Sequence, residues 1–177
     1  SNFAVAMKDL LQNVLDDILA DVPKEKIDER ISIFKRNMSN LHYDVMANPI
    51  GVKGIGKYEV RDSENVFSQY KKGTPVHVKS AINYNSLIDY WYEGKRYSKI
   101  TNGNKIKWVY LKENEFGFDT IAYKGYEDPP QVLDMIKNYI DHNKMYEQAM
   151  SKKVGMFYKA LNWGGVEDVT TSMNRFF

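Results

Sequence analysis

Apolar residues recur at helical spacing through the first forty residues, and this repeat fixes how the fold begins. In FAVAMKDLLQNVLDDILADV the recurring positions are Met7, Leu10, Leu11, Val14, Ile18 and Val22. Asp21 and Pro23 then mark a helix stop and a new helix start. A second set recurs in steps of four and three: Ile27, Ile31, Phe34, Met38 and Leu41. The pattern predicts an antiparallel helical pair with an apolar seam.

The helical repeat ends near Asn48, and no periodicity returns before Pro75. Proline and glycine interrupt this stretch at Pro49, Gly51, Gly54, Gly56, Gly73 and Pro75. Such punctuation predicts a long connecting region with short extended pieces.

Helix and strand signals return after this region. Ser80 is expected to cap a helix through AINYNSLIDYWY, with Leu87, Ile88 and Trp91 facing inward. The Asn-Gly of TNGNK predicts a tight turn before a strand, KIKWVYL. Phe116-Gly117 separates this strand from a second short strand, DTIAY.

Two more helices complete the expected order. Pro129-Pro130 starts one through VLDMIKNYI, and Asp141 or Asn143 caps a long last helix that stops at Gly164-Gly165. One face of the last helix presents Tyr146, Met150, Phe157 and Leu161. We therefore expect an α+β fold, mostly helical with a small antiparallel sheet. Its helical parts span about 2–47 and 128–163, its basic loop and strand part 48–127, and a flexible C-terminal peptide 166–177.

The charge is unevenly distributed along the chain. Between Lys53 and Lys112 there are twelve Lys or Arg and five Asp or Glu, an excess of +7. Since the whole chain has a formal net charge of +2, the remainder carries −5. A basic middle between acidic ends indicates a patch that faces a polyanion, and a solvated, salt-bridged surface is the alternative.

Several kinds of site have no support in the sequence. There is no cysteine for a disulfide or a thiolate metal site. His42, His77 and His142 lie far apart without the paired spacing of zinc ligands. No apolar run approaches the roughly 20 residues of a membrane span, and the start has no secretory signal pattern. We predict no metal site, no catalytic residue and no membrane partner for these residues.

The stretch GVKGIGKY has the letters of a phosphate-cradling loop, GxxxxGK. However, Tyr58 follows where a nucleotide site needs Ser or Thr to hold magnesium, and Pro49 stands where the preceding strand should end. A flexible basic loop near a nucleic-acid backbone is the better interpretation.

Two basic clusters predict contacts to phosphates. The segment QYKKGTPVHVKSAINYN brings three lysines and one histidine beside the expected helix start at Ser80 and within reach of Tyr70 and Tyr84; the four are Lys71, Lys72, His77 and Lys79. Cations, hydroxyls and a helix amino terminus bind phosphate oxygens without reading bases. The segment KRYSKITNGNKIKW adds Lys95, Arg96, Lys99, Lys105 and Lys107. Two clusters fit a groove along a duplex backbone better than one anion pocket.

The chain ends in TTSMNRFF, with two aromatic rings at its last positions. Thr170, Met173, Phe176 and Phe177 have the spacing of a short terminal turn that inserts one aliphatic and two aromatic side chains into a pocket on a replication sliding clamp. The polar residues after Gly164-Gly165 would let this peptide stand away from the body. A tail docked on the chain's own core is the alternative.

The order of several motifs resembles the carboxyl-terminal thumb domain of the family B replicative DNA polymerases of T-even-type bacteriophages. IDERISIFKRNMSNLHYDVMA resembles the family's second thumb helix, and TPVHVKSAINYN the segment that usually carries His-Ile-Arg-Gly. NGNKIKWVYL and NEFGFDTIAY resemble a Gly-Asn-Lys strand and the Phe-Gly link to an Ile-Ala strand. YIDHNKMYEQAMSKKVG resembles an Ile-Asp-His helix start. The likeness runs over nearly the whole chain, with a thumb over 1–165 and a clamp-binding tail over 166–177.

The resemblance implies roles for particular residues. Backbone contacts would come first from His77, Lys79 and Tyr84, and next from Lys95, Lys105 and Lys152; Met173, Phe176 and Phe177 would anchor the clamp. Three positions depart from the family pattern: Lys79 replaces Arg, Ser80 replaces Gly, and Val154 replaces Pro.

The same resemblance implies where the chemistry and the partners lie. The family's catalytic carboxylates and Mg²⁺ belong to the palm, and the usual palm signatures are absent from these residues. Expected partners are primer–template duplex DNA, the sliding clamp and the palm, finger and exonuclease remainder, in the cytoplasm of an infected bacterial host. The chain would be an excised domain or one subunit of a split polymerase. A single-stranded DNA or RNA-binding module, or a basic replication adaptor, is the alternative.

Overall fold

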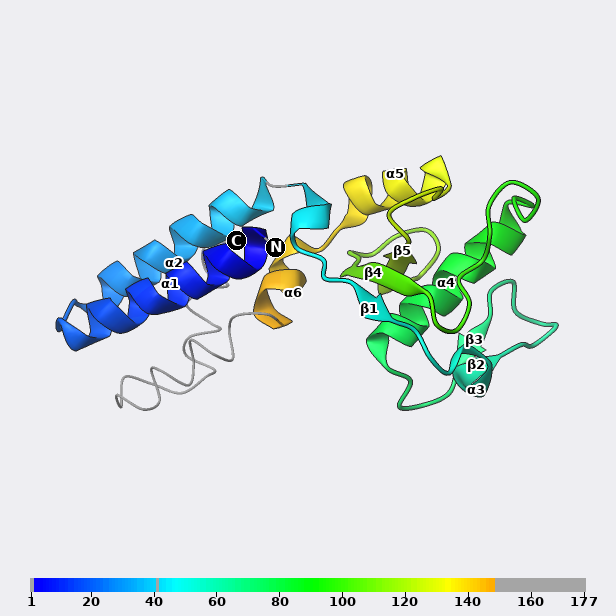
Figure 1. Ribbon diagram of the computed structural model, residues 1–177, viewed down its shortest axis with the longest axis horizontal. Helices are drawn as coiled ribbons and strands as arrows, with labels where there is room; N and C mark the ends of the chain where they lie inside the picture. The colour runs from blue at the N-terminus through cyan, green and yellow to red at the C-terminus, as the bar shows by residue number, and fades with distance from the viewer. Residues whose placement is uncertain (1, 41, 149–177) are drawn as a thin grey trace. The chain divides into compact units, whose positions relative to one another are not determined.

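The computed structural model describes residues 2–40 and 42–148, which have the predicted α+β fold (Figure 1). The chain divides into two compact units. Unit 1 takes the chain up to Met46 and from His142 onward, and unit 2 is Ala47–Asp141. The helix at Pro130–Tyr139 belongs to unit 2, whereas the sequence pattern groups residues 128–163 with the other helices.

Unit 1 is built on the predicted helical pair, α1 (Asn2–Leu19) and α2 (Lys24–Ser39), which lie antiparallel (Figure 1). Its core confirms the apolar seam and consists of Leu10, Val14, Ile18, Ile27, Ile31 and Tyr146, with Met7, Leu11, Val22 and Phe34 partly buried against it. Arg30 also bonds Asp17 across the pair at 2.7 Å. Leu41 of the predicted seam lies outside the described residues.

Helix α6 (His142–Tyr146) completes the described core of unit 1. The ring centroids of Tyr146 and Phe34 are 6.0 Å apart, and the Lys35 ammonium lies 5.4 Å from the Tyr146 ring. Burial raises the pKa of the Tyr146 phenol. The sequence predicts that Asp141 or Asn143 caps the long last helix, and the described helix begins at His142, directly after Asp141. Met150, Phe157 and Leu161 lie outside the described residues. A short 3-10 helix, η1 (Tyr43–Val45), ends the first part of the unit.

Unit 2 packs one long helix, α4 (Val76–Tyr90), against an antiparallel sheet of order β1-β4-β5. The strands are β1 (Ile50–Gly51), β4 (Lys105–Tyr110) and β5 (Thr120–Tyr123), and α5 (Pro130–Tyr139) packs against β5. The register places Val109 opposite Ile121, and both are fully buried. A second small sheet pairs β2 (Glu59–Val60) with β3 (Gln69–Tyr70), after the short helix α3 (Ile55–Tyr58). The two predicted strands and the helix start at Pro129-Pro130 are confirmed.

Helix α4 is buried on all sides along much of its length, since every residue from Ser80 to Ile88 is buried. A helix in such a place needs partners for its polar side chains, because an unpaired buried donor or acceptor is costly. Asn83 donates to the carbonyl of Thr120 at 2.9 Å and accepts from the Tyr70 hydroxyl at 3.2 Å. Asn85 donates to the carbonyl of Ile100 at 2.8 Å and accepts from its amide at 2.7 Å. Leu87 and Ile88 face the core as predicted, whereas Trp91, also predicted to face inward, caps the helix and is half-buried.

The start of α4 corrects one prediction, because Ser80 does not cap the helix. The cap is Pro75, with φ −58°, and the helix begins at Val76. Proline has no amide hydrogen to lose and its fixed φ suits the entry to a helix. The Ser80 hydroxyl donates back to the Val76 carbonyl at 2.7 Å and is hydrogen-bonded to the Thr120 hydroxyl. Its role is therefore to join the helix to β5.

The predicted turn at Asn102-Gly103 is present, with Gly103 at φ 94°. The Asn104 amide closes the turn on the Thr101 carbonyl at 3.1 Å. The strand that follows pairs with β1, from fifty residues upstream, and with β5. Val52 extends the first pairing through hydrogen bonds to Asn104 and Gly103 at 3.0 and 2.8 Å. The turn thus seats the start of β4 against the early segment of the unit.

Replacing Ile27 with Ala should lower the free energy of unfolding of unit 1 by about 2–5 kcal/mol, because it leaves a cavity between α1 and α2. Urea unfolding of the full chain, followed by far-UV circular dichroism, measures this change. Ile33→Ala on the same helix is the matched control: Ile33 is 43% exposed, and its loss should cost about 0.5 kcal/mol or less. Equal losses for both variants would show that the seam is not the core of this unit.

Candidate nucleic-acid interface

Helix α3 is the centre around which several separated basic segments of unit 2 meet. The Tyr58 carbonyl accepts from the Lys71 amide at 3.0 Å, which joins α3 to the turn before α4. The Ile55 amide donates to the Asn102 side chain at 3.2 Å, which joins α3 to the turn before β4. The helix also packs against α4. Backbone geometry therefore gathers lysines that are far apart in the sequence.

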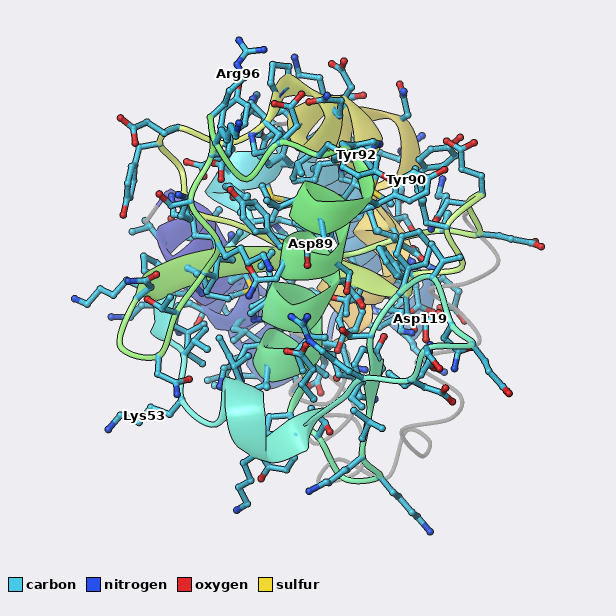
Figure 2. The ribbon with its side chains drawn as sticks, turned by 90° about the vertical axis from the view of Figure 1, so that its right-hand side faces the viewer. Lys53, Asp89, Tyr90, Tyr92, Arg96 and Asp119 are labelled. Atoms are coloured by element: carbon cyan, nitrogen blue, oxygen red, sulfur yellow. The ribbon has the colours of Figure 1, made fainter. Side chains whose placement is uncertain are left out.

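We call these lysines the lysine platform: Lys53, Lys57, Lys71, Lys72, Lys79 and Lys105. Five are exposed and Lys79 is half-buried. Figure 2 shows Lys53 extending outward at the edge of the unit. In the part of the chain that the structure describes, none of the six forms an ion pair. Their positive charge is therefore available to an anion from outside.

Two platform lysines lie beside tyrosine rings. The Lys57 ammonium is 5.1 Å from the Tyr58 ring centroid, and the Lys79 ammonium is 5.6 Å from that of Tyr70. The Tyr70 hydroxyl is fixed on Asn83, and burial raises the pKa of this phenol. These rings hold the lysine stems in place while the ammonium groups stay near the surface.

The second basic cluster predicted from the sequence is divided in the structure. Lys105 pairs in register with Gly51 and joins the platform. Lys95 lies beyond the carboxyl end of α4, on a segment where Arg96 covers the Tyr97 ring and Lys99 bonds Asp89 at 2.8 Å. The 15 residues of α4 span roughly 22 Å, at 1.5 Å per residue. The two ends of α4 therefore present separate basic groups. Lys107 is half-buried in β4, opposite Tyr123.

Tyr84 is a correction to the predicted set of backbone contacts. It is fully buried, and its hydroxyl donates to the Asp128 carboxylate at 3.0 Å. The same carboxylate accepts from the amides of Lys124 and Gly125, both at 2.8 Å. Burial, and then the charge of Asp128, raise the pKa of the Tyr84 phenol. Since Tyr84 ties α4 to the loop after β5, it cannot reach a phosphate outside.

The other predicted contacts have varied positions. His77 lies half-buried in the first turn of α4, near Lys79 in sequence. Lys152 and all of the predicted clamp anchors lie outside the described residues; the anchors are Thr170, Met173, Phe176 and Phe177. Ser80, as described above, is inside the helix.

The stretch GVKGIGKY folds as β1, a turn and α3. Gly54 begins the helix at φ 87°, a conformation that side chains other than glycine rarely adopt. The helix that follows has four residues. A phosphate-cradling loop of the nucleotide-binding kind instead leads from a buried strand into a helix, with a hydroxyl residue for magnesium.

No group of three or more His, Cys, Asp or Glu among residues 2–40 and 42–148 is placed to hold a metal ion. Over the same residues, no helix is both long enough and apolar enough to cross a bilayer.

No protein-family model matches this chain, and a search of curated proteins finds no match either. The polymerase resemblance therefore rests on the ordered motifs in the sequence, and the site must be argued from its own geometry.

Sequence reasoning missed the exposed aromatic end of α4. The Tyr92 amide bonds the Asp89 carbonyl at 3.1 Å and the Glu93 amide bonds the Ile88 carbonyl at 3.0 Å, which is a Schellman motif. Tyr92 occupies its left-handed position, at φ 56°, where glycine is usual. A side chain there costs on the order of 1 kcal/mol. Yet the Tyr92 side chain is 93% exposed, so burial does not offset this cost.

Replacing Tyr84 with Phe should lower the free energy of unfolding by about 1.5–3 kcal/mol, because it removes a hydrogen bond to a carboxylate. The pKa of Tyr84 is higher in the folded chain, so its contribution is complete below about pH 10 and falls as the pH rises beyond that. Urea unfolding at neutral and alkaline pH measures both effects. Tyr126→Phe, at a tyrosine that is 61% exposed, is the control and should change little. A variant as stable as the parent chain would contradict this role.

Proposed function

We propose that this chain holds duplex DNA by its phosphate backbone, as the thumb of a family B replicative polymerase does. The observation that supports the proposal best is the lysine platform, six lysines around α3 and the first turn of α4 that form no ion pair with any residue the structure describes. Lysine ammonium groups act as point charges toward phosphates and give little base discrimination. The expected binding is therefore strong at low salt and insensitive to sequence.

The separation of the basic groups favours an extended anion over a small one. The platform and Lys95 lie at opposite ends of α4, roughly 22 Å apart by the length of the helix. A duplex presents a phosphate every 3.4 Å along each strand, so groups at this spacing can act on one molecule. A single phosphate or nucleotide cannot reach both.

We propose no catalytic role for these residues. The carboxylate signatures of the polymerase palm are absent from the sequence. The chain would keep the primer–template positioned while two-metal phosphoryl transfer takes place in the palm.

The second part of the proposal is that residues 166–177 bind the sliding clamp. It is supported by the sequence spacing of Met173, Phe176 and Phe177. A tail held by the clamp would raise the effective concentration of the polymerase at the primer end without any new DNA contact.

A single-stranded nucleic acid is the alternative ligand, because Tyr58 and Tyr70 lie beside platform lysines and bases stack on such rings. Tyr70 is half-buried with its hydroxyl held in the core, which favours a structural role for that ring. Competition between duplex and single-stranded oligonucleotides of equal length separates the two readings.

The double variant Lys71→Gln, Lys72→Gln should weaken duplex binding and lower the salt dependence. Each lost phosphate contact removes about 0.9 from the magnitude of the slope of log K against log salt, so the slope should fall by about 1–2. Fluorescence anisotropy with labelled duplex at several salt concentrations measures this. The matched control is Lys8→Gln, Lys26→Gln, which removes the same charge from exposed positions on unit 1. Equal effects of both pairs, or a slope near zero in the parent chain, would remove the DNA proposal.

The double variant Phe176→Ala, Phe177→Ala should abolish binding to a T-even-type sliding clamp, since two aromatic anchors carry most of such an interaction. Duplex binding should stay within about twofold, because no charge is lost. Surface plasmon resonance with immobilised clamp, and anisotropy with duplex, give the two readouts. Clamp binding that survives the substitution would exclude the tail as its site.

A further inference from the structure

The carboxyl end of α4 forms a surface unlike the lysine platform at its other end. Five aromatic rings meet there in a continuous chain of contacts, with centroid separations from 4.9 to 6.5 Å. They come from the segment before β3, from the end of α4 and from the link between β4 and β5. We call this the aromatic ledge, and its rings are Phe67, Tyr90, Trp91, Phe116 and Phe118.

The ledge continues into exposed apolar side chains. Val66 is 76% exposed, Tyr90 48% and Tyr92 93%. These three line a pocket of about 620 Å³ together with Asp89. A second pocket, of about 260 Å³, adjoins it through Val66 and Asp89 and reaches Asp62 and Phe67. Figure 2 shows Tyr90 and Tyr92 near each other at this end of α4, well away from Lys53.

The backbone fixes Tyr92 in its outward position. The Schellman hydrogen bonds hold it in a left-handed conformation that favours glycine, and its ring gains almost no burial. Large aromatic side chains are enriched where protein interfaces form, since they bring much contact area at low entropic cost. An exposed tyrosine in this position is therefore explained by contact with something outside the chain.

The charges around the ledge select a cationic occupant. The carboxylates Asp62 and Asp89 line the two pockets, and Arg61 lines the second one. Two cations at the pockets already have partners: Arg61 is bonded to Glu59 at 2.8 Å, which raises the pKa of Arg61, and Lys99 is bonded to Asp89. The carboxylates of Glu59, Asp62 and Asp89 therefore exceed these two cations by one charge. The last carbonyls of α4 add partial negative charge. A guanidinium or ammonium over the rings would be attracted.

We propose that the aromatic ledge is a docking site for a segment of a partner protein that carries arginine or lysine next to a large aliphatic or aromatic side chain. The apolar side chain fills the space between Val66, Tyr90 and Tyr92, and the cation lies toward Asp89 and Asp62. This site is separate from the proposed DNA surface and does not depend on it. It would let unit 2 bind a protein segment as well as a nucleic acid.

Nuclear magnetic resonance of the isotope-labelled full chain tests the proposal with a defined probe. The probe is a short blocked peptide in which arginine alternates with leucine. Two matched peptides replace arginine with glutamate or leucine with serine. The arginine–leucine peptide should shift the amide signals of Tyr90, Tyr92 and Phe116, and both matched peptides should bind about tenfold more weakly or not at all.

The variant Tyr92→Ser should reduce peptide affinity about tenfold, as loss of an exposed aromatic anchor does. It should leave duplex binding unchanged, which separates this site from the lysine platform. Tyr126→Ser is the control, because Tyr126 is also exposed on unit 2 but contacts none of the ledge rings. Because Tyr92 is almost fully exposed, the variant does not remove core packing, and a matching spectrum elsewhere verifies its fold.

Any one of five outcomes would overturn the proposal. One is that the amide signal shifts caused by the peptide spread over unit 2 without preference for the ledge. Another is that these shifts persist unchanged in Tyr92→Ser. A third is that an oligothymidylate displaces the peptide from Tyr90 and Tyr92, which would make the ledge a base-stacking surface. A fourth is that the amide signals of the ledge shift with protein concentration in the absence of peptide, which would make the occupant a second copy of the chain. The fifth is that removal of residues 166–177 alone changes the same signals, which would make the chain's own tail the occupant.

Discussion

The buried helix α4 is the constraint on which unit 2 depends. A helix surrounded by protein on every side, as α4 is from Ser80 to Ile88, must find an internal partner for each polar side chain. Ser80, Asn83 and Tyr84 find theirs on β5 and on the loop that follows it. These bonds fix the rotation of the helix as well as its position, because turning it would leave several groups unpaired at once. Apolar packing alone would allow α4 more rotation about its own axis.

A helix fixed in this way determines what its two ends present. The amino end meets α3 and the turn at Lys71, and the chain there contributes lysines that pair with no carboxylate among residues 2–40 and 42–148. The carboxyl end meets Phe67 and Phe116, beside two pockets that Asp62 and Asp89 line. The two ends of one rigid helix therefore present different side chains, lysines at the amino end and aromatic rings at the carboxyl end.

The sequence predicts elements well where the signal is local. The seam of α1 and α2, the helix start at Pro129-Pro130 and the strand after Gly117 all follow from spacing or from a proline or glycine. It predicts poorly where a distant residue decides. Ser80 has the side chain of a helix cap, but Thr120, forty residues later, gives it a buried partner. Tyr84 carries a hydroxyl that could donate to a phosphate, but this hydroxyl donates to Asp128 and the side chain is buried in the core.

Parts of the candidate site were predictable for the same reason. Lys71, Lys72 and Lys79 are neighbours in the sequence and remain so in space. Lys105 joins them only through pairing with the two-residue strand β1, which is too short to have a pattern. The aromatic ledge gathers three segments and gives no signal in any one of them. Tyr92 could be found only from its backbone conformation.

The side-chain amide of Asn85 forms the hydrogen bonds that a neighbouring strand would otherwise form with the backbone of Ile100. This amide group bonds both the carbonyl and the amide of Ile100, as an adjacent strand would, so residue 100 is anchored to α4 independently of the nine residues that precede it. Those intervening residues need not hold β4 in place. Since doubling a loop costs only about 0.6 kcal/mol of closure entropy, the outer part of this connection around Gly94 is a suitable point for inserting a reporter peptide or a small foreign domain. Because the side-chain amide of Asn85 anchors Ile100, unit 2 should tolerate added residues around Gly94.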